Sequence, residues 1–223
     1  MTLASFWDAD RLERYGRQIL VPGIGGRGQR RLANSRVAVI GTGSLAELVG
    51  TALARVGIGT IDVEPSLARQ LQGSAAPDCK MTAAEPPRVL SGSTELVVDT
   101  ALSALDWHQR LEELAQARWI LWLREQAGCG YVATWQPKGK QESCPCWVFR
   151  DTQGEETVAT KFEQSAAVAW AAAWASALAV RLLTDAELSG PPKLYWYRVR
   201  SGEVAERLSS RGNRCEYRNA GPG

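Results

Sequence analysis

The apolar positions in the first half of the chain alternate between short continuous runs and longer stretches with helical spacing. Residues 37–40 form a continuous apolar run, as expected for a strand that is covered on both faces. Residues 45–56 repeat apolar side chains every three or four positions, which predicts a helix, and residues 58–63 read as the next strand. A strand, a glycine turn, a helix and a second strand within about thirty residues predict a right-handed βαβ unit.

The same rules place elements along the rest of the chain. We expect helices at 8–20, 29–32, 107–117 and 166–180, and strands at 95–99, 119–123 and 131–135. Two hairpins are expected, one pairing 131–135 with 146–149 and one pairing 193–200 with 203–208. Residues 66–87 carry only a weak pattern. Together these elements predict one α/β domain over residues 1–223 with a mostly parallel sheet: a helical arm (1–36), a nucleotide-binding-like half (37–130) and a final part (131–223).

Composition narrows the class of protein. The chain has 223 residues and a net charge of +2, so no nucleic-acid partner is implied. The first ten residues carry acidic side chains and no targeting signal, and five cysteines, an odd number, suit a reducing compartment better than a disulfide framework. The apolar run at 166–180 is shorter than the ~20 residues that cross a bilayer. We therefore expect a cytoplasmic protein that does not bind membranes.

A glycine-rich loop joins the first strand of the βαβ unit to its helix. Gly41 and Gly43, with Ala46, satisfy the G-x-G-x-x-G/A pattern. Glycines let the backbone approach a phosphate, and a helix N-terminus supplies N–H groups and a positive dipole end. Glu64 follows about twenty residues later, where an acid can hold ribose hydroxyls. Taken alone, this loop fits NAD, another nucleotide, or a turn that binds nothing.

Several motifs around this loop point to one family. The chain resembles the ThiF/MoeB/HesA family, which includes the ubiquitin-activating enzymes, in Arg14-Tyr15-Gly16-Arg17-Gln18, Gly28-Gln29-Arg30-Arg31-Leu32, the loop itself and Gly57-Ile58-Gly59-Thr60-Ile61. Members use ATP to adenylate the C-terminus of a small carrier protein. The resemblance implies a three-layer, Rossmann-like adenylation fold and favours ATP over NAD.

The resemblance also implies roles for single residues. It assigns six nucleotide-binding positions: Gly41, Gly43, Glu64, Arg69, Lys80 and Asp99. Of these, Arg69 matches the arginine that contacts the ATP phosphates in the family, and Lys80 matches the family's lysine only loosely. In the family, the arginine at the position of Arg17 crosses a dimer interface and reaches the ATP of the partner subunit. The implied partners are a second copy or a complete ThiF/MoeB-like enzyme, together with a small ubiquitin-like carrier protein or peptide.

Three departures from the family pattern bear on activity. Leu102 stands where a second aspartate helps to hold magnesium, and leucine offers no oxygen ligand. Ser44 and Ala46 replace loop glycines and are expected to crowd a phosphate. The stretch from 155 to 164, which matches the family's catalytic cysteine region, has no cysteine. These departures favour a degenerate, non-catalytic subunit with weak ATP binding, and the alternative is an active adenylyltransferase with a rearranged metal site.

Family members often carry two Cys-x-x-Cys pairs that bind structural zinc. Here the first pair is Cys144-Pro145-Cys146, one residue too close, and the second is reduced to Cys215. Three thiolates and a fourth ligand could still hold zinc. We expect instead a remnant of the site, with little or no bound metal.

Overall fold

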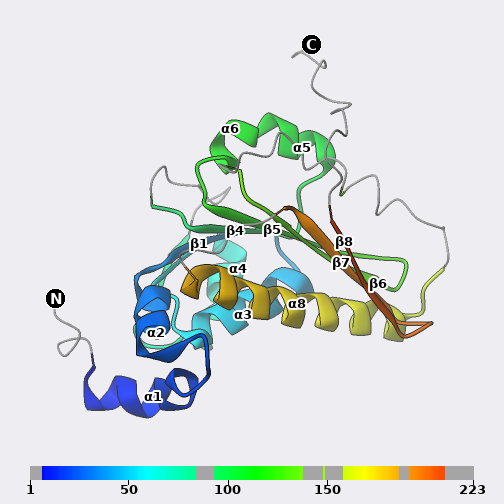
Figure 1. Cartoon of the computed structure of the whole chain (residues 1–223). Helices are drawn as coiled ribbons and strands as arrows, with labels where there is room; N and C mark the ends of the chain where they lie inside the picture. The colour runs from blue at the N-terminus through cyan, green and yellow to red at the C-terminus, as the bar shows by residue number, and fades with distance from the viewer. Residues whose placement is uncertain (1–6, 84–92, 138–147, 149–157, 186–190, 209–223) are drawn as a thin grey trace.

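The computed structural model describes residues 7–83, 93–137, 148, 158–185 and 191–208, and its strands form one eight-stranded sheet in the order β3-β2-β1-β4-β5-β6-β7-β8 (Figure 1). The strands are β1 Arg36–Ile40, β2 Thr60–Val63, β3 Lys80–Ala83, β4 Leu96–Asp99, β5 Trp119–Gln126, β6 Cys129–Trp135, β7 Lys193–Arg198 and β8 Glu203–Leu208. The helices are α1 Ala9–Ile19, α2 Gly25–Asn34, α3 Ser44–Val56, α4 Pro65–Leu71, α5 Ala104–Gln109, α6 Leu111–Leu114 and α8 Lys161–Thr184.

The parallel half of the sheet confirms the mostly parallel α/β prediction. β1 lies between β2 and β4 and is parallel to both, and β3 and β5 continue this half on either side. Ile40 pairs with Asp99, so β1 and β4 end at the same edge. The connections from β1 and from β4 leave toward opposite sides of the sheet, and such a switch point opens a crevice at the carboxyl ends of the strands.

The antiparallel half corrects one predicted hairpin. β6 pairs with β5 through a tight turn at Ala127 (φ 52°) and Gly128 (φ 74°), a conformation that favours two-residue hairpins. The other side of β6 pairs with β7. The predicted pairing of residues 131–135 with 146–149 is therefore wrong, because both sides of β6 are already occupied; of 146–149, only Val148 is among the described residues. The predicted hairpin of β7 with β8 is confirmed.

Helices cover both faces of the sheet, which confirms the three-layer prediction (Figure 1). The side chains of α3, α4 and α8 pack on one face and those of α5 and α6 on the other. The single helix predicted at 107–117 is instead the pair α5 and α6, and the weakly patterned stretch 66–87 contains α4 and β3.

The long helix α8 begins and ends outside its predicted bounds. Its N-terminus has a capping box, in which the Thr160 hydroxyl accepts from the Glu163 N–H and the Glu163 carboxylate accepts from the Thr160 N–H. Among the described helices, α8 is the one long and apolar enough to cross a bilayer by length and composition. In this fold it packs against α3, β5 and β6.

The N-terminal arm is anchored at the end of α3 that lies opposite the glycine loop. Tyr15 is fully buried, and its hydroxyl donates to the Asp78 carboxylate at 2.7 Å. A Cβ atom on Gly57 would lie 2.8 Å from the Tyr15 ring and 2.8 Å from Nε2 of Gln29, so only glycine fits there. The Gln29 amide donates to the Val56 carbonyl at 2.8 Å. Tyr15, Gln29 and Gly57 therefore hold the arm against the fold.

Candidate functional site

The glycine loop runs from the end of β1 to the start of α3, and its two glycines differ in the space around them. Both have positive φ, 105° at Gly41 and 84° at Gly43. A Cβ atom on Gly41 would lie 2.4 Å from Oγ1 of Thr100 and 2.7 Å from Cβ of Ala101, so packing against the loop after β4 requires this glycine. A Cβ atom on Gly43 would meet nothing within 4 Å.

The N-terminus of α3 opens onto this free space. Gly43 is its N-cap, no side chain caps the helix, and Thr42, Gly43 and Ser44 are exposed. Uncapped N–H groups at the positive end of a helix attract anions. The loop therefore presents the uncapped N-terminus of α3 to solvent.

Ala46 does not crowd the loop. It is fully buried and belongs to the core cluster between α3 and the sheet, together with Val49 and Leu53. The expectation that its methyl group intrudes on a phosphate is wrong, because Ala46, the third residue of α3, points toward the core. Ser44, in contrast, is exposed at the first position of α3.

Glu64 lies beside the glycine loop. It follows β2 directly as the N-cap of α4, and its Oε1 atom accepts a hydrogen bond of 3.1 Å from the Gly41 N–H. The structure thus brings together Gly41 and the acid that the sequence proposed for ribose. One N–H of the loop is engaged by this internal carboxylate.

Asp99, at the end of β4, is used entirely within the protein. It is fully buried; Oδ1 accepts from the N–H groups of Ala101 (3.0 Å) and Leu102 (2.9 Å), and Oδ2 accepts from the Trp107 indole. Burial raises the pKa of the Asp99 carboxyl group, and these hydrogen bonds oppose the rise. Asp99 shapes the turn after β4 and has little capacity left for a ligand.

The edge near Asp99 does not fit a magnesium site. Leu102 is half-buried and packs against the cluster on the α5–α6 face. No group of three or more histidine, cysteine, aspartate or glutamate side chains within the described ranges could hold a metal ion. A hard cation needs oxygen ligands, and the side chain at this position supplies none.

The remaining nucleotide-site candidates are more dispersed. Arg69 is exposed in the last turn of α4. Lys80 is the first residue of β3 and pairs with Thr60, the first residue of β2. Gly41 and Glu64 follow the C-terminal ends of β1 and β2, whereas Lys80 lies level with the N-terminal end of β2. The four residues of β2 separate these two edges by about 13 Å. The structure does not bring Lys80 into the site.

Arg17 lies far from the glycine loop of its own chain. It is exposed in the last turn of α1, two residues after Tyr15. Tyr15 packs at the C-terminal end of α3, while the loop lies at the N-terminal end of that 13-residue helix. A helix of this length spans about 20 Å. A role for Arg17 at a nucleotide would therefore concern another subunit.

Arg124 is a site residue that the sequence reasoning missed. Its guanidinium donates to the Leu102 carbonyl at 2.6 Å and lies 5.2 Å from the centre of the Trp122 ring. It places a positive charge beside the turn after β4. The available signal was a charged residue directly after five buried positions of a strand, two positions from Trp122.

The proposed zinc ligands Cys144, Cys146 and Cys215 lie outside the described residues, so the expectation of little bound zinc stays a prediction. Two described cysteines, Cys79 and Cys129, are free thiols. Burial raises the pKa of both thiols, to about 11 for Cys79, so neither is a reactive thiolate at neutral pH.

Comparisons with known proteins agree with this architecture. Residues 15–64 match the ThiF family. The adenylyltransferase and sulfurtransferase MOCS3 of Dictyostelium discoideum is 50% identical over 50 residues, 22% of this chain and 12% of that protein. MOCS3 of Mus musculus is 37% identical over 108 residues, 44% of this chain and 24% of that protein. The matched region thus spans about a quarter or less of these two relatives.

Solved structures extend the likeness to nearly the whole chain, at the level of fold alone. PaaA is 14% identical with a TM-score of 0.65, covering 91% of this chain and 84% of that chain. MccB of E. coli, solved with succinimide, is 14% identical with a TM-score of 0.67, covering 91% and 73%.

Proposed function

We propose that this chain, which is related to the ThiF/MoeB-type adenylyltransferases, is a non-catalytic subunit that pairs with an active adenylating enzyme or binds a small carrier protein or peptide. The relationship is the premise: it rests on the ThiF match, on the MOCS3 relatives and on the fold shared with MccB. The proposal concerns what this chain does within that relationship.

The turn after β4 is the observation that carries the proposal. Both carboxylate oxygens of Asp99 accept hydrogen bonds from within the chain, and Leu102 occupies the position of the family's metal-binding acid. A developing pyrophosphate charge would find no carboxylate-held cation at this position. The geometry therefore supports weak ATP binding without adenylation.

The surface of α1 supports pairing with a second subunit. Three apolar side chains near Arg17 are exposed: Leu12 (46%), Leu20 (81%) and Val21 (46%). Apolar side chains that gather on a surface favour burial against a partner. Arg17 lies between Leu12 and Leu20 in the chain and is also exposed.

ATP–pyrophosphate exchange tests this function. We expect no exchange by the chain alone, and faster exchange by a complete ThiF/MoeB-like enzyme from the same organism when the chain is added than when that enzyme is measured alone. Magnesium-dependent exchange by the purified chain alone would contradict the proposal.

An active adenylyltransferase is the second candidate, and the free space beside Gly43 favours it. Ser44→Glu tests whether this space holds phosphate. Glutamate is well tolerated in the first turn of a helix, but its charge would repel an anion there. If the chain is active, Ser44→Glu should abolish exchange, whereas the neutral control Ser44→Gln should keep most of it.

A further inference from the structure

The guanidinium of Arg124 is held on two sides, beside the turn after β4. Arg124 is half-buried in β5, and one of its N–H groups donates to the Leu102 carbonyl at 2.6 Å. Its Cζ atom lies 5.2 Å from the centre of the Trp122 ring. A guanidinium has five N–H donors, so this hydrogen bond leaves most of them for a ligand.

Arg36 and Arg110 are also half-buried, and each of them pairs with a carboxylate. Nε of Arg36 lies 2.6 Å from an oxygen of Asp62, and Nε of Arg110 lies 3.0 Å from an oxygen of Glu113. Arg124 forms no ion pair with any residue that the structure describes, and its acceptor, a backbone carbonyl, is neutral. Charged groups that are partly removed from water are normally paired. The state of Arg124 therefore indicates that an anion from another molecule binds it.

Asp99 offsets the charge of Arg124 only in part. It is fully buried, and its two oxygens accept hydrogen bonds from Ala101, Leu102 and Trp107. Burial raises the pKa of this carboxyl group, and the hydrogen bonds and the charge of Arg124 oppose the rise. The two charges therefore interact through space without forming an ion pair. A ligand with one negative charge suits this place better than a polyanion, which Asp99 would repel.

The side chain of Arg124 lies on the sheet face opposite α8, next to an aromatic surface. Trp122, two residues earlier in β5, packs in the cluster on that face. Across the strands, Arg124 pairs with Tyr131 of β6, and Tyr131 pairs with Trp196 of β7. Both rings pack against the same cluster. Arg124, Tyr131 and Trp196 therefore form one row on this face of the sheet.

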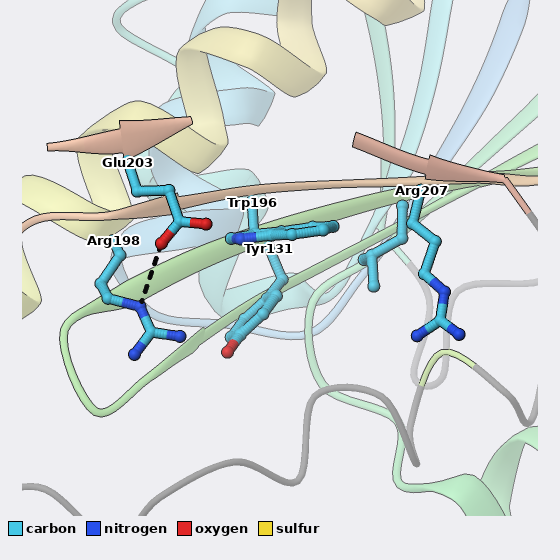
Figure 2. Close-up of a pocket in the computed structure, with 6 residues that line it drawn as sticks. Tyr131, Trp196, Arg198, Glu203 and Arg207 are labelled. Carbon is cyan, nitrogen blue, oxygen red and sulfur yellow. Dashed lines mark ion pairs between the residues drawn. The ribbon is translucent and has the colours of Figure 1, made fainter. Parts of the chain in front are cut away.

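A cavity of about 210 Å³ lies at the far end of this row (Figure 2). Figure 2 shows the rings of Tyr131 and Trp196 next to each other in it. The full lining is Tyr131, Leu194, Trp196, Arg198, Glu203 and Arg207. Pockets for drug-sized ligands usually measure about 300–1,000 Å³, so this one holds about one side chain. Neighbouring strands lie about 4.8 Å apart, which places the backbone of Trp196 about 10 Å from that of Arg124.

We propose that Arg124 binds the carboxylate of an extended peptide segment of a protein partner, and that an apolar side chain of the same segment enters the cavity between Tyr131 and Trp196. A guanidinium holds a carboxylate with two parallel hydrogen bonds. About three residues of extended chain span the 10 Å between the two ends of the row. The carboxylate comes from the end of the partner chain or from an acidic side chain. The inference rests on the proposed function for its partner class, a protein or peptide, but not on the nucleotide loop.

Isothermal titration calorimetry with short N-acetylated peptides tests the proposal. The probe is Ser-Ala-Phe-Ala-Ala with a free C-terminal carboxylate, compared with the same peptide amidated and with amidated Ser-Ala-Phe-Ala-Glu. We expect at least one of the two acidic peptides to bind about five- to tenfold more tightly than the neutral amide, between an exposed ion pair and a buried one. The tighter of the two identifies the source of the carboxylate. Replacement of its phenylalanine by alanine should weaken binding further.

Arg124→Gln should remove the preference for the acidic peptide over the neutral amide. Arg181→Gln is the matched control, because it makes the same charge change at an exposed arginine in the last turn of α8, on the other side of the sheet. Thermal melting checks that the variants are folded. If Arg124→Gln does not fold, Arg124→Met tests the same point, since methionine keeps an apolar stem over Trp122 without the charge.

The proposal is overturned if neither acidic peptide binds more tightly than the amide, if the Arg124 variants keep the preference, or if Arg181→Gln loses it equally. Inorganic pyrophosphate is the competing probe. If Arg124→Gln weakens pyrophosphate binding more than peptide binding, the site prefers phosphate and the proposal is wrong. Pyrophosphate exchange, measured separately, reports on the proposed function, so either idea can fail without the other.

Discussion

The carboxylate of Glu64 accepts a hydrogen bond from the backbone N–H of Gly41 at 3.1 Å, and this contact joins the ends of β1 and β2 at the loop. The acid and the loop are 23 residues apart in the chain. In this arrangement the carboxylate supports the loop and places a negative charge beside the open N-terminus of α3. A phosphate that approached the helix would meet both the N–H groups and this charge.

Glu64→Gln should therefore strengthen the binding of inorganic pyrophosphate about two- to fivefold, because it removes a nearby negative charge and keeps an oxygen acceptor for Gly41. Glu64→Ala should instead lower the free energy of unfolding by about 1 kcal/mol, since the Gly41 N–H loses its partner. Calorimetric titration and urea denaturation measure the two effects. Weaker pyrophosphate binding by Glu64→Gln would mean that the charge does not oppose the anion.

Leu102→Asp should introduce magnesium dependence into ATP binding, because it supplies a negatively charged oxygen ligand where the wild-type side chain has no oxygen. For the wild-type chain we expect weak ATP binding that magnesium changes little. Leu102→Asn is the control, since it has a similar size without the charge. Titrations with and without magnesium check this. Low-micromolar, magnesium-dependent binding by wild type would contradict the interpretation of the turn.

Asp99→Ala should destabilise the fold by about 3 kcal/mol, because it removes the acceptors of three hydrogen bonds at a fully buried position. Asp99→Asn should cost less, since one oxygen remains for the N–H groups of Ala101 and Leu102. Urea denaturation gives both values. A loss below about 1 kcal/mol for Asp99→Ala would show that the turn holds without its carboxylate.

Arg17→Ala should lower pyrophosphate exchange by a mixed complex about ten- to hundredfold, if the guanidinium contacts the nucleotide of a partner in the transition state. The variant is compared with wild type at matched complex content. Arg55→Ala is the control, because Arg55 is also an exposed arginine in the last turn of a helix, α3. Unchanged exchange in an intact complex, or a chain that stays monomeric at all concentrations, would exclude this role.

The N-terminus of α8 should lose stability in acid. Hydrogen bonds from Arg200 and from the Thr160 N–H lower the pKa of Glu163 from 4.5 to about 2. Because the folded-state pKa is depressed, the contribution is complete above the unfolded pKa and is lost as pH falls through the folded value. The melting temperature of Glu163→Gln should lie below that of wild type at pH 6, and the gap should close toward pH 2. The exposed substitution Glu13→Gln serves as the control and should show no such convergence.

The sequence by itself determined many of the local elements and the resemblance to the ThiF/MoeB/HesA family. Runs of apolar residues and helical spacing predicted β1, α3, β2, β4 and β5, because burial of one face imposes these periods on neighbouring residues. The loop glycines and the motifs around Tyr15 and Gln29 pointed to the ThiF/MoeB relationship before any coordinates. The sequence also singled out Gly41 and Glu64 as candidate nucleotide-site residues, and the structure brings them into contact.

The tertiary structure alone decided how residues distant in the chain meet. Strand pairing and register depend on contacts between residues far apart in the chain. β6 pairs with β5 and β7. Lys80 lies at the end of β3 that is distant from the glycine loop. The same holds for side chains whose direction depends on packing, such as Ala46, which faces the core, and Asp99, whose oxygens turn inward to the chain's own donors. Local patterns state which residues are buried, but the partner that each buried group finds depends on contacts that only the folded chain creates.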